Sequence, residues 1–313
     1  MDLKGFVARV GPLLGTADFK ADVPLAPFTT FGVGGRADLL ARVRSIGMLR
    51  DVLAAATKHA VPVTVLGGGS NVLVADAGVR GVVIRLHLTE ISQPVSDRIR
   101  AEAGVTINGL VRWTISRGLA AVERWAGTPG TVGGAIYGNA HWARQNIGDL
   151  ITMVQVATPE GTLVDVASAD MGFAYDTSRL QRTGEVAVWA EIRCEPGVSH
   201  DLRARARESL AFRKRTQPLA LPSAGCVFQN PDPERDRVPA GIPASAGALV
   251  DRAGLKGRRR GGAEISDVHA NFIVNRGGAT AADIRALIED ARLGVKNAFD
   301  VELRDEVVFL GTF

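Results

Sequence analysis

The sequence of 313 residues has only two cysteines, Cys194 and Cys226, and five histidines. Two thiols in so long a chain are typical of a cytosolic protein, although one disulfide between them stays open. These residues are scattered without the spacing of metal ligands, so we expect no metal site. No run of 18 uncharged apolar residues occurs, so no membrane-spanning helix is expected. The first fourteen residues contain Lys4 and Arg9 and lack the apolar stretch of a signal peptide, so the expected location is the cytoplasm.

Lysine is also scarce, because 31 of the 37 basic residues are arginine. Basic residues cluster at 203–215 and 256–260 without aromatic residues between them, which makes nucleic acid the weakest candidate partner. The clusters indicate either a solvated helix face and a loop, or a neighbouring anionic small molecule. A hydrophobic fraction of 46% and a charged fraction of 22% exclude a disordered chain. The length is sufficient for two or three domains that need no disulfide or metal to fold.

Apolar periodicity divides the chain into mixed helices and strands. It predicts helices over residues 45–59, 108–117, 199–215 and 281–293, with Gly294 ending the last one. It predicts strands over residues 61–65, 72–74, 82–86, 187–194, 271–275 and 301–310, and a hairpin over 151–167. The composition changes after Glu195-Pro196-Gly197, which is the best domain boundary. Together these signals indicate an α+β architecture.

Two glycine-rich loops are the first candidates for a binding site. Gly67-Gly68-Gly69-Ser70-Asn71 directly follows a predicted strand, where glycines let backbone N–H groups approach phosphate oxygens. The pattern is neither a Rossmann fingerprint nor a P-loop. The second loop, residues 127–135, reads GTPGTVGGA, and Asn139 lies just beyond it. Two such loops in one domain suggest a large anionic ligand such as a dinucleotide, although a pair of structural turns stays open.

Several motifs in one order resemble the UDP-N-acetylenolpyruvoylglucosamine reductase family. They are Thr29-Thr30-Phe31, the two glycine loops, the segment 222–231 (PSAGCVFQNP) and the segment 269–275 (HANFIVN). The resemblance spans residues 24–311 and implies a two-lobed FAD-binding domain of the vanillyl-alcohol-oxidase (PCMH) type, with lobes at 1–86 and 87–198. A C-terminal α+β substrate-binding domain is then expected at 199–313. The short segment 178–213 resembles the compact type of the family, which lacks an extra substrate loop.

The resemblance also implies the chemistry. The family reduces the enolpyruvyl group of UDP-N-acetylglucosamine enolpyruvate to UDP-N-acetylmuramate for peptidoglycan synthesis, with bound FAD and NADPH as co-substrate. We expect a monomer with no membrane or nucleic-acid partner. The implied cofactor-binding residues are Gly67, Gly68, Gly69, Ser70, Asn71, Gly127, Pro129, Gly130, Thr131, Gly133, Gly134 and Asn139.

The expected catalytic groups follow from this reaction. Hydride addition to the alkene leaves negative charge that spreads into the carboxylate, so the site needs a cationic or hydrogen-bonding group and an acid. The family's proton donor, usually a serine, corresponds here to Cys226. A free thiol is mostly protonated near pH 7 and is a stronger acid than a serine hydroxyl, although a buried small apolar residue is the alternative interpretation.

The family's second catalytic group, a glutamate in the last strand, corresponds to Glu306. If the predicted strand 301–310 alternates regularly, Glu306 shares a face with Arg304 and Glu302. The neighbouring Asp305 is the residue most easily confused with it. The resemblance assigns substrate contacts to Tyr175, Asn230 and Asn271.

Two positions depart from the family pattern. The family usually reads Phe-x-Tyr-Arg-x-Ser, with the arginine helping to hold the substrate carboxylate, whereas Asp176 stands at that position here. A carboxylate there repels the developing enolate, so either another arginine substitutes or activity is compromised. The candidates are Arg124, Arg144, Arg179 and Arg182. His141 stands where a glycine is commoner, and the simplest interpretation is a surface histidine. A sugar or alcohol oxidase with the same FAD fold, or a non-catalytic flavin- or nucleotide-binding protein, stays open as an alternative.

Overall fold

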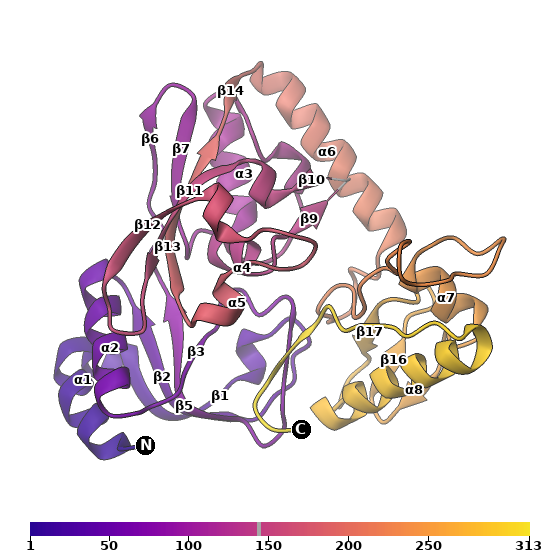
Figure 1. Ribbon diagram of the computed structural model, residues 1–313, viewed down its shortest axis with the longest axis horizontal. Helices are drawn as coiled ribbons and strands as arrows, with labels where there is room; N and C mark the ends of the chain where they lie inside the picture. The colour runs from indigo at the N-terminus through magenta and orange to yellow at the C-terminus, as the bar shows by residue number, and fades with distance from the viewer. Residues whose placement is uncertain (143–144) are drawn as a thin grey trace. The chain divides into compact units, whose positions relative to one another are not determined.

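The computed structural model describes residues 1–142 and 145–313, which form two compact units (Figure 1). The first unit comprises residues 1–23, 37–68 and 80–212, and the second comprises 24–36, 69–79 and 213–313. Each unit is therefore assembled from segments that are far apart in the sequence. The expected three-part division at residues 86 and 198 stays a prediction.

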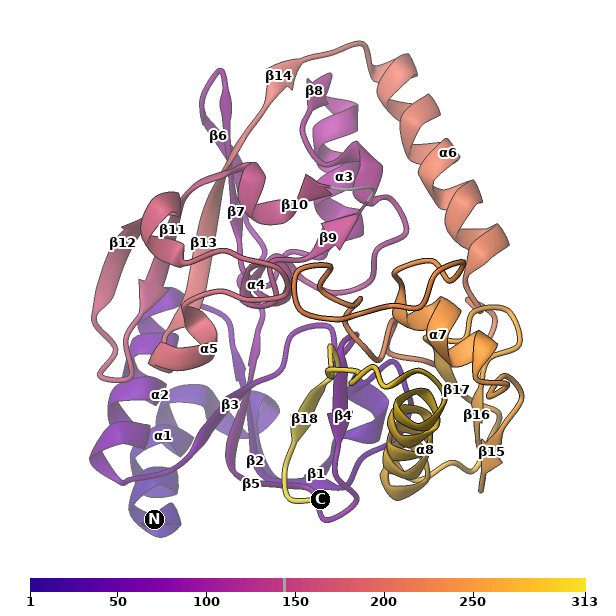
Figure 2. The same cartoon turned by 45° about the vertical axis from the view of Figure 1, so that its right-hand side comes forward.

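The first unit is built around two sheets (Figure 2). A four-stranded sheet has the order β1-β2-β5-β3, with β1 Phe19–Pro24, β2 Arg36–Val43, β5 Val79–Leu86 and β3 Val63–Val65. A five-stranded sheet has the order β12-β11-β13-β7-β6, with β12 Leu163–Ala167, β11 Ile151–Ala157, β13 Val186–Arg193, β7 Arg98–Glu102 and β6 Ile91–Val95. The predicted hairpin over 151–167 is the β11–β12 pair, in which Val154 pairs with Val166.

Helices α1 (Leu3–Asp18) and α2 (Ile46–Lys58) lie side by side against the four-stranded sheet (Figure 1). The predicted helix at 45–59 is confirmed, because the Ser45 side chain accepts a hydrogen bond from the Met48 N–H and caps α2. Its apolar stripe packs in one core with the neighbouring strands. Helices α3 (Ile107–Ser116) and α4 (Val132–Tyr137) pack on the five-stranded sheet in a second core. The smaller elements are η2 Glu123–Trp125, η3 Ile147–Asp149, η4 Ser168–Met171, α5 Leu180–Thr183, β8 Leu119–Ala120, β9 His141–Trp142, β10 Gln145–Asn146 and β14 Glu195–Pro196.

The second unit has its own core between two helices and short strands. Its elements are η1 Ala26–Phe28, β4 Val72–Val74, α7 Ala246–Arg252, β15 Arg259–Arg260, β16 Ala263–Ile265, β17 Ile273–Asn275, α8 Ala281–Phe299 and β18 Val308–Leu310. Strands β15, β16 and β17 form one antiparallel sheet, and β4 pairs in parallel with β18. Leu73 from β4 is buried in the same core as Leu249 from α7 and Leu287 from α8.

Two predicted boundaries in the C-terminal part are wrong. Helix α8 continues past Gly294 and ends at Phe299, where Asp300 adopts a left-handed conformation. Gly294 is needed inside the helix for packing, because a Cβ there would lie 2.8 Å from a Leu255 methyl carbon. The predicted strand 301–310 is regular only over β18, so an alternating face shared by Glu306, Arg304 and Glu302 does not form.

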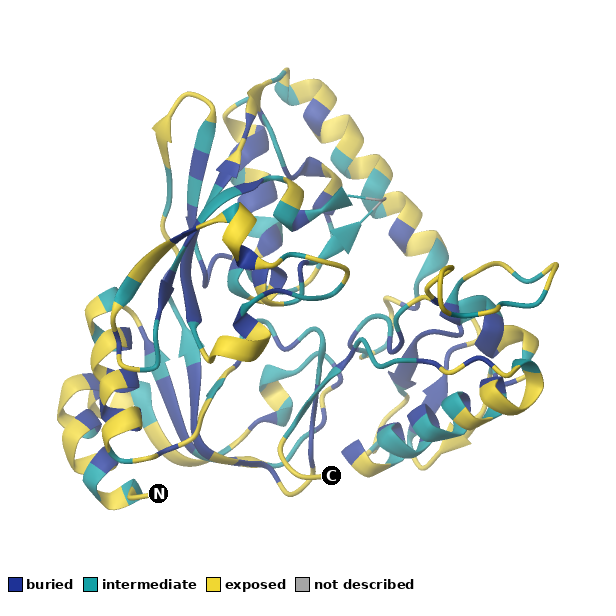
Figure 3. Ribbon diagram, viewed as in Figure 1, coloured by how far each residue is buried: buried dark blue, intermediate teal, exposed yellow. Residues whose placement is uncertain are grey.

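The basic segments are exposed, and several of their charges are matched within the chain (Figure 3). Helix α6 (Ser199–Thr216) buries Leu202 and Arg213 and is otherwise exposed or half-buried. Arg258 and Arg260 both donate to Asp290, which favours the loop interpretation of cluster 256–260. Both cysteines are thiols that take no part in a disulfide. Across residues 1–142 and 145–313, each helix is too short or too polar to cross a membrane.

Candidate active site

In the first unit, the two glycine-rich loops meet backbone to backbone. A Cβ at Gly68 would lie 2.6 Å from the Gly130 Cα, and one at Gly67 would lie 2.7 Å from the Thr131 Oγ1. The Thr131 hydroxyl also accepts a hydrogen bond from the Gly134 N–H at the start of α4. No side chain at residues 67 and 68 fits between these loops, so the peptide groups themselves line the junction. This cradle fits the phosphates of a dinucleotide such as FAD, which backbone N–H groups bind without side-chain obstruction.

Asn139, which follows the second loop, has structural hydrogen bonds to two other segments. Its side chain is buried, its Nδ2 donates to the Ala174 carbonyl at 2.8 Å, and its Oδ1 accepts from the Gly148 N–H at 3.0 Å. The amide therefore fixes the turn that carries Tyr175. Its role at the cofactor stays a prediction.

In the second unit, the end of the first glycine loop supports the segment that carries Glu306. The Asn71 Nδ2 donates to the Glu306 carbonyl at 3.0 Å, and the Val308 N–H donates to the Asn71 carbonyl at 3.0 Å. A Cβ at Gly225 would lie 4.0 Å from the Ser70 carbonyl, so this loop also lies beside the residue that precedes Cys226. Three motifs that are distant in the sequence are thus neighbours in this unit.

Cys226 and Glu306 flank one short backbone pairing. The Glu306 N–H donates to the Val227 carbonyl at 2.8 Å, and the Gln229 N–H donates to the Arg304 carbonyl at 2.9 Å. These bonds place the residue after Cys226 directly opposite Glu306. The structure therefore places Glu306 opposite the residue next to Cys226, although both predicted catalytic residues lie outside a regular strand.

Asn271 stabilises this pairing through two side-chain hydrogen bonds to the main chain of Phe228. It is 3% exposed, its Oδ1 accepts from the Phe228 N–H at 2.9 Å, and its Nδ2 donates to the Phe228 carbonyl at 2.8 Å. Asn230 uses its Oδ1 to accept a hydrogen bond from the Ala246 N–H, where α7 begins. Both amides have structural hydrogen bonds, and their substrate contacts stay predictions.

Arg213 is a candidate functional residue that the sequence reasoning missed. It lies near the end of α6 and is 7% exposed, and its Nη1 donates to the Gln217 Oε1 at 3.1 Å. Burial lowers the pKa of Arg213 to about 10, and the charge of the nearby Cys226 partly opposes this shift. The basic cluster 203–215 hid this residue among exposed arginines. Its burial is a property of the fold, and no signal in the sequence separates it from its exposed neighbours.

Asp305 is distinguished from Glu306 by its partner. The Arg292 Nη2 donates to the Asp305 Oδ1 at 2.5 Å, and the Arg292 Nε donates to the Leu303 carbonyl at 3.2 Å. Burial raises the pKa of Asp305, and the charge of Arg292 opposes that rise. The Asp305 carboxylate therefore has a structural ion pair with α8, which leaves Glu306 as the catalytic candidate of the two.

In the first unit, the two residues that differ from the family pattern, Asp176 and His141, form a cluster with Tyr175. The His141 Nδ1 lies 3.2 Å from the Asp176 Oδ1, and the His141 and Tyr175 rings have centroids 5.1 Å apart. The Asp176 side chain is 10% exposed, and its Oδ2 is buried without a hydrogen-bond partner in the described chain. Asp176 also has a φ of 53°, a left-handed conformation that aspartate tolerates better than most residues. His141 is thus not an isolated surface histidine.

Two family models match the chain. A model described as an FAD binding domain matches residues 37–167, and one described as UDP-N-acetylenolpyruvoylglucosamine reductase, C-terminal domain, matches residues 217–310. A UDP-N-acetylenolpyruvoylglucosamine reductase of Anaeromyxobacter dehalogenans is 43% identical over 293 residues, covering 93% of this chain and 85% of that protein. This chain belongs to the UDP-N-acetylenolpyruvoylglucosamine reductase family. The resemblance inferred from the motifs is confirmed.

Solved structures agree with this family. The crystal structure of the Thermus caldophilus UDP-N-acetylenolpyruvylglucosamine reductase has a TM-score of 0.78 and 32% identity, covering 94% of this chain and 98% of that one. A variant of Phl p 4, a glucose oxidase, has a TM-score of 0.50 and 15% identity over 62% of this chain and 44% of its own. The second likeness shows the fold alone. The expected α+β class with an FAD-binding domain of PCMH type is confirmed.

The arginines that were expected to replace the family's arginine do not all have a free side chain. Arg179 donates from Nε and Nη2 to the two Glu185 oxygens, each at 2.9 Å, so its guanidinium is committed elsewhere. Arg124 is exposed on η2, and Arg144 lies outside the described residues. Arg182 has its Nη2 3.3 Å from where a Cβ on Gly172 would lie.

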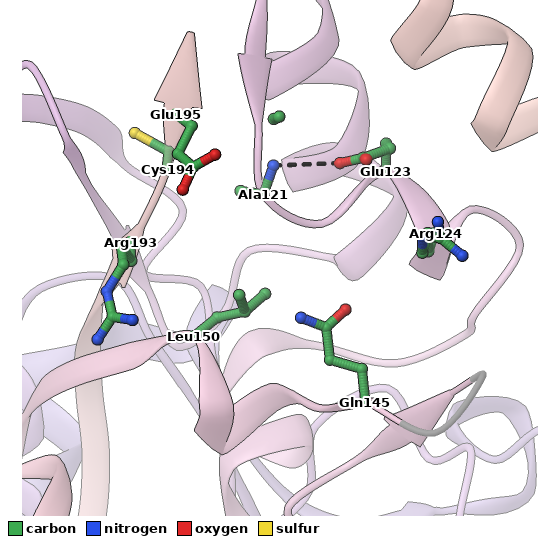
Figure 4. A pocket seen from close by; sticks show the side chains of 9 residues that line it. Ala121, Glu123, Arg124, Gln145, Leu150, Arg193, Cys194 and Glu195 are labelled. Carbon is green, nitrogen blue, oxygen red and sulfur yellow. Dashed lines mark hydrogen bonds between the residues drawn. The ribbon is translucent and has the colours of Figure 1, made fainter. Parts of the chain in front are cut away.

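A pocket of about 210 Å³ lies in the first unit beside β8 and β14 (Figure 4). Arg193, Cys194 and Glu195 line one side, and Glu123 and Arg124 line another. The Glu123 carboxylate accepts a hydrogen bond from the Ala121 N–H, as the figure shows. Of the predicted catalytic, substrate-binding and cofactor-binding residues, none lines this pocket, and the candidate arginine Arg124 is the one predicted residue at its wall.

Proposed function

We propose that the chain reduces the enolpyruvyl group of UDP-N-acetylglucosamine enolpyruvate to the lactyl ether of UDP-N-acetylmuramate. In this family the cofactors are FAD and NADPH. The observation that carries the proposal is the pairing of Glu306 with the residue after Cys226, in a chain that retains the family's motifs. When bound, FAD reduced by NADPH supplies the hydride that adds to the methylene carbon of the alkene.

Cys226 is the proton donor of this proposal. As hydride adds to the methylene carbon, the electron pair of the double bond moves to the carbon that bears the carboxylate. That carbon then takes a proton from the Cys226 Sγ, which becomes a thiolate and is reprotonated from solvent. The charges of Arg213 and Cys226 interact, so the guanidinium stabilises the thiolate left after proton donation.

Glu306 acts at the substrate carboxylate. In its protonated form it donates a hydrogen bond to the enolate as negative charge develops there. The Asn71 and Val227 hydrogen bonds hold the Glu306 main chain on both sides, which limits the positions available to its carboxyl group. Tyr175, Asn230 and Asn271 are the proposed substrate-binding residues.

The proposed cofactor site uses the two glycine loops of the cradle. Gly67, Gly68 and Gly130 provide peptide groups for the diphosphate, since side chains are excluded at the first two positions. The protein is proposed to act as a monomer in the cytoplasm. Its two thiols, which take no part in a disulfide, support that location, because a reducing compartment keeps thiols reduced.

The test is a pair of half-reactions followed by flavin absorbance. The purified protein is expected to be yellow, NADPH should bleach the flavin without oxygen, and the enolpyruvyl substrate should restore the colour in one turnover. Failure to bind FAD would contradict the proposal. Rapid oxygen consumption with an alcohol or sugar would favour the oxidase alternative, and bleaching without reoxidation by substrate would favour a non-catalytic flavoprotein.

A further inference from the structure

We propose that His141, held by Asp176, supplies the positive charge that binds the substrate carboxylate in this chain. The inference rests on the proposed function and names a residue for which the family pattern has no equivalent. His141 is the group in contact with substrate, and Asp176 is a positioning residue that acts through it.

The contacts of Asp176 support this assignment. Its carboxylate is nearly buried, and one of its oxygens lies 3.2 Å from the His141 Nδ1. An aspartate in this position orients the imidazole through Nδ1 and leaves the Nε2 nitrogen for another partner. The Asp176 Oδ2 has no hydrogen-bond partner in the described chain, so the buried charge depends on His141 for compensation.

The ring of Tyr175 supports the placement of His141 at the substrate. Tyr175 is 44% exposed, and its ring lies tilted beside the His141 imidazole at an interplanar angle of 40°. The Asn139 amide fixes the turn behind both residues through the Ala174 carbonyl. The imidazole is therefore held from two sides beside a side chain that the proposed function assigns to substrate binding.

The contact between Asp176 and His141 explains why both departures occur together. Where the family has an arginine and a glycine, this chain has Asp176 and His141, and the two side chains contact each other. Asp176 alone would repel the enolate, whereas a protonated histidine paired with it presents a hydrogen-bond donor to the carboxylate. The pair thus replaces one long cationic side chain with a shorter one from β9.

Two substitutions at His141 separate charge from structure. His141→Gln keeps a hydrogen-bonding side chain without positive charge, and His141→Arg keeps the charge. We expect His141→Gln to lower kcat/KM for the enolpyruvyl substrate by about 10- to 100-fold, the size of a lost charge-assisted hydrogen bond. His141→Arg should retain activity within a few fold. Thermal melting and FAD content establish that each variant is folded.

Asp176→Asn tests the positioning role through coupling. In the native background it should lower kcat/KM for the substrate, and in the His141→Gln background it should have little further effect, because the two residues act as a unit. Additive losses would contradict the pairing. Equal activity of His141→Gln and the native protein would overturn the inference. Loss of flavin bleaching by NADPH in the native protein would instead contradict the proposed function, so the two failures are distinguishable.

Discussion

The site residues of the two units are positioned in different ways. Cys226 and Glu306 retain the family's sequence motifs, and the Glu306 main chain is held by a main-chain hydrogen bond to Val227 and by one from the Asn71 side-chain amide. Asp176 and His141 depart from the motifs and are positioned by a side-chain ion pair. A main-chain pairing tolerates a change of side chain, such as cysteine for serine, without moving its neighbour. In a side-chain pair, a change at one residue requires a matching change at the other. The departure at Asp176 therefore cannot be interpreted from the sequence without its partner His141.

The largest effect is expected at the thiol. Cys226→Ala should leave flavin reduction by NADPH nearly intact and slow flavin reoxidation by the enolpyruvyl substrate by about 100-fold or more, because the acid is removed while the backbone pairing remains. Stopped-flow absorbance measures both half-reactions. Cys194→Ala is the matched control, since that thiol is buried and bonds to the Ser96 carbonyl. Equal slowing of both half-reactions would count against Cys226 as proton donor.

Glu306 and Asp305 are adjacent carboxylates in the second unit, so substitutions at each compare a catalytic role with a structural one. Glu306→Gln should lower kcat by about 10- to 100-fold, since an amide is a weaker donor to the enolate than a carboxylic acid. Asp305→Asn removes a charge at the next residue and should leave kcat within a few fold, because that carboxylate is paired with Arg292 and has no part in the proposed chemistry. Steady-state kinetics of both variants measure the contrast. The reverse pattern would exchange the two assignments.

Replacing Asp176 by the family's arginine tests whether the native site depends on the pair of Asp176 and His141. Asp176→Arg alone should lower kcat/KM by about tenfold, since it replaces the partner of His141 with a second cation. Adding His141→Gly should recover much of this loss, because the double variant has the family's pattern. A rise in turnover for Asp176→Arg alone would show that Asp176 has no role in the native site.

The sequence predicted elements with a local signal and missed those that depend on distant contacts. The Ser45 cap and apolar stripe identified α2, and the two β-rich runs identified the β11–β12 hairpin. By contrast, Gly294 was interpreted as a helix end, because its contact with Leu255 is not visible in the local sequence. The motif that contains Cys226 was recognised from its neighbours in sequence. Arg213 and the His141–Asp176 pair required coordinates, since burial and pairing are properties of the fold.

The smallest expected effect concerns the ion pairs that stabilise the second unit. The hydrogen bond from Arg276 lowers the pKa of Glu264, burial opposes this shift, and Arg259 lowers it further. Glu264 is 1% exposed and receives hydrogen bonds from Arg276 at 2.6 Å and Arg259 at 2.5 Å. Because its pKa is lower in the folded state, its stabilisation is present above its unfolded pKa of about 4.5 and is lost as pH falls.

The pKa of Asp305 shifts in the opposite direction, because burial raises it in the folded state. Its contribution to stability is greatest below its unfolded pKa and is lost as pH rises through the folded value. We therefore expect Glu264→Gln to flatten the fall in unfolding free energy between about pH 5 and pH 3, and Asp305→Asn to steepen it. Urea unfolding at several pH values measures both slopes against the native protein. Parallel slopes for all three proteins would mean that neither carboxylate is coupled to folding, and the main-chain pairing would then hold Cys226 and Glu306 without help from these charges.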